Sequence, residues 1–214
     1  MFKYKEYIET GDYEKALSEI FEAIERDKDN ETHYINGALV LSRLGKIEEA
    51  ERFLQKAISI EQNSFSALYT LGNLYFDNER FSEAKKIYLA AYGLKPEDSD
   101  LNFMLAQVFQ NLGEATMSVP FFETALKNSP DDVELLFQYG LILCQLEQYE
   151  SAVKLLNKVT NMTDHADAEY NLGLALYMLT EDKSLAIQHF KRASQLKNDH
   201  HLANHALKKF KDLE

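Results

Sequence analysis

The 214-residue sequence contains one cysteine, three prolines and no tryptophan. The single cysteine, Cys144, cannot form an internal disulfide, which fits a reducing compartment, and we expect a cytoplasmic location. No apolar run approaches the roughly 18 residues that a membrane-spanning helix needs. The N-terminus also lacks the apolar stretch of a secretory signal peptide. The sequence therefore argues against a membrane protein and against a disulfide-rich secreted domain.

Positive charge is also scarce. Lysine and arginine number 23 against 35 acidic residues, which gives a net charge of −12. Binding to a phosphate backbone requires clustered cations, and an acidic field repels nucleic acids and anionic membrane surfaces. We therefore expect neither nucleic acid nor membrane as a partner.

A period of 34 residues organises the chain. Pro96 and Pro130 are 34 residues apart. In this register position 8 is small: Ala38, Gly72, Ala106, Gly140 and Gly173. Position 20 is also small: Ala16, Ala50, Ala84, Ser118, Ala152 and Ala186. Position 24 is large: Ile20, Leu54, Tyr88, Phe122, Leu156 and Phe190. Such a period is typical of a repeat protein.

Each period contains two runs with the three- and four-residue spacing of a helix. The predicted helix pairs are 2–10 with 13–26, 31–44 with 47–60, 65–78 with 81–94, 99–112 with 115–128, 133–146 with 149–161, and 166–179 with 184–196. One hairpin cannot bury its apolar face alone, but stacked hairpins bury a continuous core. The expected fold is an all-α solenoid over residues 1–214, with repeats at about 1–30, 31–64, 65–98, 99–132, 133–165 and 166–199.

The pattern resembles the tetratricopeptide repeat. The third repeat carries it most completely, with Leu68, Leu71-Gly72, Tyr75, Ala84, Tyr88, Ala91 and Pro96. The resemblance covers essentially the whole chain and implies a right-handed superhelix of antiparallel helix pairs. Within that family the chain looks like the small stand-alone bacterial type, with no appended domain.

The fourth repeat and the C-terminus depart from the regular pattern. A last helix is predicted at 201–212 and carries Lys208, Lys209 and Lys211. These lysines suit a solvent-exposed outer face, as a capping helix of a solenoid requires. Pro120 lies inside a predicted helix, and we expect it to kink that helix or delay its start.

Residues with the spacing of an active site are scarce. His201 and His205 have a metal-compatible spacing, but no third ligand is placed to complete a site, so we expect His200, His201 and His205 at the surface of the last helix. No histidine base is placed in sequence to activate Cys144, so we expect this residue to fill a small apolar space. No glycine-rich phosphate loop is present, because seven of the eight glycines fall at repeat positions 7, 8 or 15. We expect no enzyme, no metal and no cofactor.

A second stripe runs along the first helix of each pair, at positions 2, 5, 9 and 12. In relatives of this family it lines a concave groove, which makes these residues the candidate partner-binding site: Ile35, Leu39, Tyr69, Asn73, Phe76, Phe103, Gln107, Gln110, Phe137, Leu141, Tyr170, Leu174 and Tyr177. Asp100, Glu134 and Asp167 at position 2 form its expected acidic rim. Aromatic side chains are efficient anchors at such surfaces.

The leading hypothesis is a scaffold or adaptor that binds a peptide or helix of another protein, with apolar anchors and some basic residues. One alternative is a structural subunit that associates with itself. Another is a detached regulatory part of an enzyme assembly.

Overall fold

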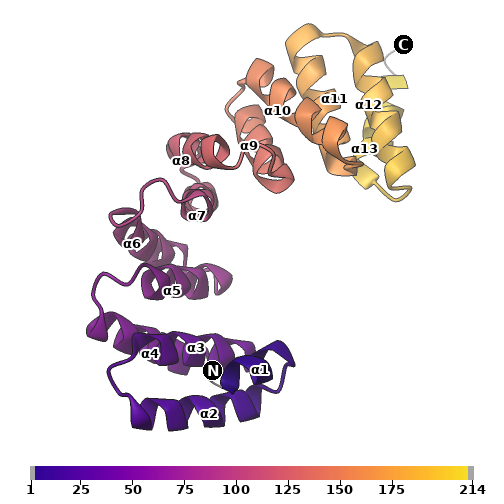
Figure 1. Ribbon diagram of the computed structural model, residues 1–214. Coiled ribbons are helices and arrows are strands. Elements are labelled where there is room, and N and C mark those ends of the chain that lie inside the picture. Colours follow the sequence, from indigo (N-terminus) through magenta and orange to yellow (C-terminus); the bar gives the residue numbers. More distant parts are fainter. Residues whose placement is uncertain (1–2, 212–214) are drawn as a thin grey trace. The chain divides into compact units, whose positions relative to one another are not determined.

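The computed structural model describes residues 3–211, and within them it contains thirteen helices (Figure 1). The helices are α1 (Tyr4–Glu9), α2 (Tyr13–Arg26), α3 (Glu31–Arg43), α4 (Ile47–Ile60), α5 (Phe65–Asp77), α6 (Phe81–Tyr92), α7 (Ser99–Asn111), α8 (Ala115–Asn128), α9 (Val133–Gln145), α10 (Tyr149–Met162), α11 (Ala166–Thr180), α12 (Lys183–Leu196) and α13 (His201–Lys211). Each corresponds to a predicted helix, and the ends differ by at most two residues. The predicted helix ends at residues 2 and 212 lie outside the described residues. The all-α fold is confirmed.

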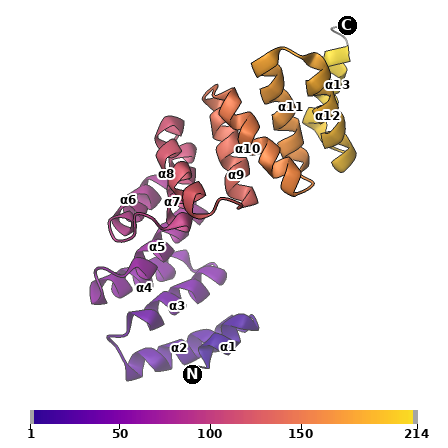
Figure 2. The same ribbon diagram turned by 45° about the horizontal axis from the view of Figure 1, so that its top comes forward.

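The chain divides into two compact units, the first ending at Leu112 and the second beginning at Gly113. In the first unit α1 packs against α2, α3 against α4, α5 against α6, and α7 against α6. In the second unit α8 packs against α9, α9 against α10, α11 against α12, and α13 against α12 (Figure 2). The boundary falls inside the fourth repeat, 99–132. One continuous right-handed superhelix over residues 1–214 stays a prediction.

Short polar side chains start the first helix of the second to fifth pairs. The side chains of Asn30, Ser64, Asp98 and Asp132 each accept a hydrogen bond from a backbone N–H in the first turn that follows. These N–H groups have no partner within the helix, so the cap defines where the helix begins. The capping residues recur at intervals of 34, which is why helix starts repeat with the period of the sequence.

The small positions allow the helices to approach closely. Ala16, Ala50, Ala84 and Ala91 have no exposed surface, and neither does the large residue Tyr88. A side chain larger than alanine at any of the four alanine positions would displace a neighbouring helix, because protein interiors have no spare volume. The burial confirms the register derived from the sequence.

Pro120 lies inside α8, which nevertheless begins at Ala115. Of the two effects expected of Pro120, a delayed start does not occur, because a helix can continue past a proline when only one backbone hydrogen bond is lost. The kink stays a prediction. No helix within residues 3–211 combines the length and the apolar character needed to cross a membrane.

Candidate functional site

In the first unit the predicted second stripe lies on α3, α5 and α7. Six of its side chains are half-buried and so keep part of their surface accessible: Tyr69, Asn73, Phe76, Phe103, Gln107 and Gln110. Leu39 is 46% exposed. Ile35 is only 9% exposed and offers little surface to a partner, contrary to the expectation. The reason is that α3 packs against both α4 and α5, so only part of its circumference remains open.

Tyr69 is held by other aromatic rings. Its ring stacks on Phe65 with centroids 5.7 Å apart and lies 6.0 Å from the ring of Tyr88. Burial, followed by the negative charges of Asp100 and Asp98, raises the pKa of Tyr69 to about 12. The ring therefore forms a rigid wall of the stripe and stays neutral at physiological pH.

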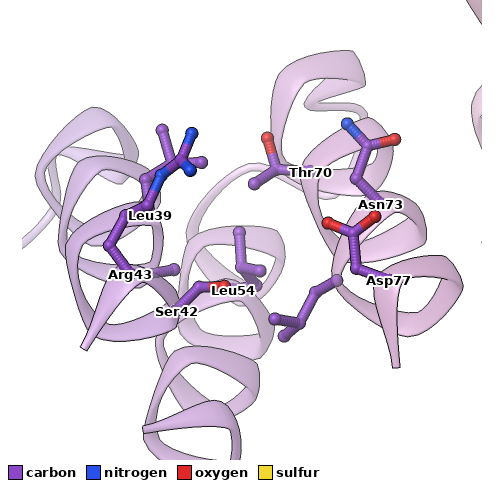
Figure 3. Close-up of a pocket in the computed structure, with 9 residues that line it drawn as sticks. Leu39, Ser42, Arg43, Leu54, Thr70, Asn73 and Asp77 are labelled. Atoms are coloured by element: carbon purple, nitrogen blue, oxygen red, sulfur yellow. The ribbon is translucent and has the colours of Figure 1, made fainter. Parts of the chain in front are cut away.

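Between α3 and α5 the stripe opens into a hollow of about 450 Å³ (Figure 3). Its polar and exposed lining comes from two helices: Leu39, Ser42 and Arg43 of α3, and Thr70, Asn73 and Asp77 of α5. Ala38, Leu54 and Leu74 supply an apolar surface. Leu54 belongs to α4, so the second helix of one hairpin closes the space between two first helices. A volume of this size and mixed lining is in the range of ligand pockets.

A hydrogen bond from Tyr88 fixes the orientation of the Asn73 amide. The hydroxyl of Tyr88 donates a hydrogen bond of 2.6 Å to Asn73 Oδ1. Tyr88 is fully buried and packs over Gly72, where any Cβ would collide with its ring. Because its carbonyl oxygen is already used, Asn73 presents its NH₂ group to other partners. Figure 3 shows the nitrogen of Asn73 on the side of the amide that faces the hollow.

The predicted acidic rim is solvent-exposed at all three positions. Asp100, Glu134 and Asp167 are exposed residues. Glu134 accepts a hydrogen bond of 2.7 Å from Gln138, and Asp167 lies 3.1 Å from Nε2 of His200. Asp100 belongs to the first unit, and Glu134 and Asp167 belong to the second.

In the second unit the predicted stripe also takes part in the packing between helices. Phe137 is 9% exposed, and its ring lies 4.4 Å from that of His165. Three further stripe residues pack against a buried cluster formed by Ala186 and Phe190 of α12 and Ala206 of α13: Tyr170, Leu174 and Tyr177. The Tyr177 and Phe210 rings are 4.8 Å apart. Leu141 is half-buried. These side chains also serve the packing of α13 and of the α11 start, but apart from Phe137 they are half-buried, like most of the stripe in the first unit.

The histidines have structural roles that the sequence did not reveal. His200 was expected at the surface but is 4% exposed, because its ring packs against Tyr170 and its Nδ1 accepts the N–H of Ala203, which caps α13. Its Nε2 lies 3.1 Å from Asp167, an ion-pair distance without hydrogen-bond geometry. His201 and His205 are exposed, as predicted.

Cys144 is half-buried, and burial raises the pKa of its thiol to about 11. Among residues 3–211, no three His, Cys, Asp or Glu side chains gather in a way that could hold a metal ion.

The repeats match known families. The family profile described as "Psidin, N-terminal TPR repeats region" matches residues 4–107, and two profiles described as "Tetratricopeptide repeat" match residues 99–132 and 121–154. The crystal structure of YrrB, described as a TPR protein with an unusual peptide-binding site, superposes with a TM-score of 0.81 at 32% identity, over 88% of this chain and 97% of YrrB. The chain belongs to the tetratricopeptide-repeat (TPR) family.

Two further relatives extend this picture. The TPR repeat-containing protein YpiA of Bacillus subtilis is 28% identical over 165 residues, which are 77% of this chain and 39% of YpiA. The chain thus spans about two fifths of the length of that relative. PilF of Pseudomonas aeruginosa is 19% identical with a TM-score of 0.79, over 99% of this chain and 94% of PilF, and shares the fold. TPR repeat proteins mediate protein–protein interactions.

Three residues of the hollow were missed by the sequence reasoning. Thr70 occupies position 6, outside the predicted stripe, and Arg43 and Asp77 both occupy position 13. Position 13 is the last residue of α3 and of α5, where a charge is ordinarily a solvated helix end. The sequence did contain one signal for these two residues: Arg43 and Asp77 carry opposite charges at the same position of two successive repeats.

Proposed function

We propose that this TPR protein is an interaction module that binds a peptide segment of another protein on the α3–α5–α7 face of its first unit. The observation that carries the proposal is the hollow between α3 and α5, because it is lined by two residues of the predicted stripe, Leu39 and Asn73. The peptide-binding site of YrrB, a relative of nearly the same extent, supports a ligand of this class.

The face combines apolar and hydrogen-bonding side chains, so it suits an extended peptide better than it suits a partner with a smooth apolar surface. Leu39 and the half-buried Phe103 supply apolar area, and Asn73 and Gln107 can bond to a peptide backbone. Asp100 adds an exposed negative charge, so some basic residues in the partner would favour association through steering. Apolar anchors would supply most of the affinity, since a few well-packed contacts dominate an interface.

The second unit contributes fewer residues to the proposed binding site, because the hollow lies in the first unit. Tyr170, Leu174 and Tyr177 already pack with α13, and Phe137 is buried. Leu141, Glu134 and Asp167 keep exposed or half-exposed surface and stay as candidate contacts.

A peptide-display library panned on the whole protein provides defined ligands for the test. The affinity of selected peptides is then measured for wild type, Leu39→Ala and Leu89→Ala. Leu39 and Leu89 are 46% and 42% exposed, so the two substitutions remove similar surface, but Leu89 lies on α6 away from the hollow. We expect Leu39→Ala to weaken binding roughly ten-fold and Leu89→Ala to leave it unchanged.

Equal effects of the two substitutions, with both variants folded by circular dichroism, would show that the peptide binds elsewhere. Selection of no peptide at all would argue against a peptide-binding function.

A further inference from the structure

The hollow carries two opposite charges on opposite sides. Arg43, at the end of α3, and Asp77, at the end of α5, both line it. Figure 3 shows the guanidinium beside Leu39 on α3 and the carboxylate of Asp77 on α5, on the two sides of the space between these helices. Both residues are exposed. Neither makes a salt bridge or a side-chain hydrogen bond within residues 3–211. Each charge is therefore available to a ligand.

Asn73 adds a donor between these charges. Its oxygen is occupied by the buried Tyr88 hydroxyl, and its NH₂ group lies near the hydroxyl of Tyr69, whose pKa it lowers against the larger effect of burial. An amide NH₂ has two hydrogens, so one remains for a ligand acceptor. A peptide carbonyl oxygen is an acceptor of the required kind. Asn73 and Asp77 are one helical turn apart and lie on the same side of α5.

The remaining surface of the hollow is apolar. Leu39, Leu54 and Leu74 line it together with Ala38. A single medium-sized apolar side chain would remove this surface from water, which favours binding through the hydrophobic effect.

We propose that the hollow selects an extended peptide segment in which an apolar side chain is flanked by an acidic residue on one side and a basic residue on the other. The apolar side chain enters the hollow, and a backbone carbonyl accepts a hydrogen bond from Asn73. The acidic residue lies toward Arg43 and the basic residue toward Asp77. This inference rests on the proposed function and names the class of peptide that the site prefers.

The charge arrangement distinguishes this ligand from simpler ones. The net charge of −12 by itself favours a uniformly basic peptide. Such a peptide would place a cation against Arg43, however, and a uniformly acidic one would place an anion against Asp77. Like charges at close range are unfavourable, and exposed opposite charges attract modestly. Only a segment with both signs satisfies both sides of the hollow.

The test uses three synthetic peptides of equal length with a central leucine: one flanked by glutamate and lysine, one by two glutamates and one by two lysines. Their affinities for the whole protein are measured by fluorescence anisotropy. We expect the mixed peptide to bind wild type roughly five-fold more tightly than either other peptide. This preference must shrink at high salt, because the charges are exposed and screened.

Charge-reversal variants make the test specific. Arg43→Glu should shift the preference to the peptide with two lysines, and Asp77→Lys should shift it to the peptide with two glutamates. Arg52→Glu on α4, a reversal at an exposed arginine that does not line the hollow, is the control and should keep the preference for the mixed peptide.

Any of four outcomes would overturn the inference. One is binding of all three peptides with equal affinity, and another is a preference that does not follow the reversed charges. The third is a dimer of wild type that Leu39→Ala dissociates, because the hollow would then hold a second copy of the chain. If none of the three peptides binds while library peptides still bind and depend on Leu39, this inference fails and the proposed function stands.

Discussion

The ring of Tyr88 occupies the space that a side chain at Gly72 would need. A Cβ at Gly72 would lie 2.9 Å from Tyr88 Cζ and closer still to Cδ1 and Cε1. The same tyrosine donates its hydroxyl proton to Asn73, the next residue along α5. The glycine of the repeat pattern therefore lets α5 and α6 approach closely and positions the side chain that orients Asn73.

Gly72→Ala should accordingly destabilise the protein. The added methyl group displaces a fully buried ring, and over-packing of this kind costs about 1–3 kcal/mol. The control is Gly93→Ala, since Gly93 has a helical conformation and its Cβ would make ordinary contacts with Ala90 O at 3.4 Å and Leu89 O at 4.0 Å. Urea unfolding of both variants is the measurement. An equal free energy of unfolding for Gly72→Ala and wild type would contradict the close approach of α5 and α6.

Tyr88→Phe should weaken peptide binding while the protein stays folded. The substitution keeps the ring and removes the hydroxyl, so Asn73 is free to rotate its amide and loses its fixed donor direction. Tyr75→Phe is the control, because the Tyr75 hydroxyl donates a 2.8 Å hydrogen bond to Glu51 and Tyr75 does not line the hollow. We expect about three-fold weaker binding for Tyr88→Phe alone. A similar loss in both variants would mean that general destabilisation, and not the orientation of Asn73, is responsible.

Stability should fall as the pH drops below about 6.5. Burial lowers the pKa of His33, with a smaller opposing effect of Asp27, and the residue is 1% exposed. A folded-state pKa below the unfolded value means that the unfolded chain binds the proton more tightly, so the contribution of neutral His33 is present at neutral pH and declines in acid. Thermal unfolding between pH 7.5 and pH 5 measures this decline.

His33→Asn provides the comparison for that measurement, since an amide can still bond to the Tyr4 hydroxyl that lies 3.2 Å from His33 Nδ1. The melting temperature of this variant should depend less on pH than that of wild type. Parallel pH profiles would show that other groups cause the acid sensitivity.

Cys144 should react slowly with thiol reagents in the folded protein. Burial raises the pKa of its thiol to about 11, so the reactive thiolate is scarce at pH 8. The rate of reaction with a disulfide reagent, compared in the absence of denaturant and in urea, checks this. A rate in the folded protein equal to that in urea would be inconsistent with the burial of the thiol.

The repeat period was sufficient to locate the helices and the core. Small residues at positions 8 and 20 and large residues at position 24 recur because each hairpin faces the same packing constraint, and Ala84 and Tyr88 are buried as that constraint predicts. The N-terminal caps recur for the same reason. Local sequence therefore specifies local structure throughout residues 3–211, with Pro120 as an exception whose expected effect on the helix start did not occur.

The candidate site could be predicted only in part. The helical spacing correctly placed Leu39 and Asn73 on an accessible face, but it also included Ile35 and Phe137, which neighbouring helices bury. It missed Arg43 and Asp77, because a charge at a helix end looks the same in sequence whether it faces solvent or a hollow.

The sequence by itself determined the helix pairs, their capping residues and the small positions where they cross, because these depend on spacing within one repeat and its neighbours. Only the tertiary structure decided which stripe residues remain accessible, since that depends on what α4, α6 and α13 cover. It also decided that Tyr88 bonds to Asn73 and that Arg43 and Asp77 line the same hollow. Those relationships join side chains from different helices, and their distances follow from packing rather than from the order of residues in the chain.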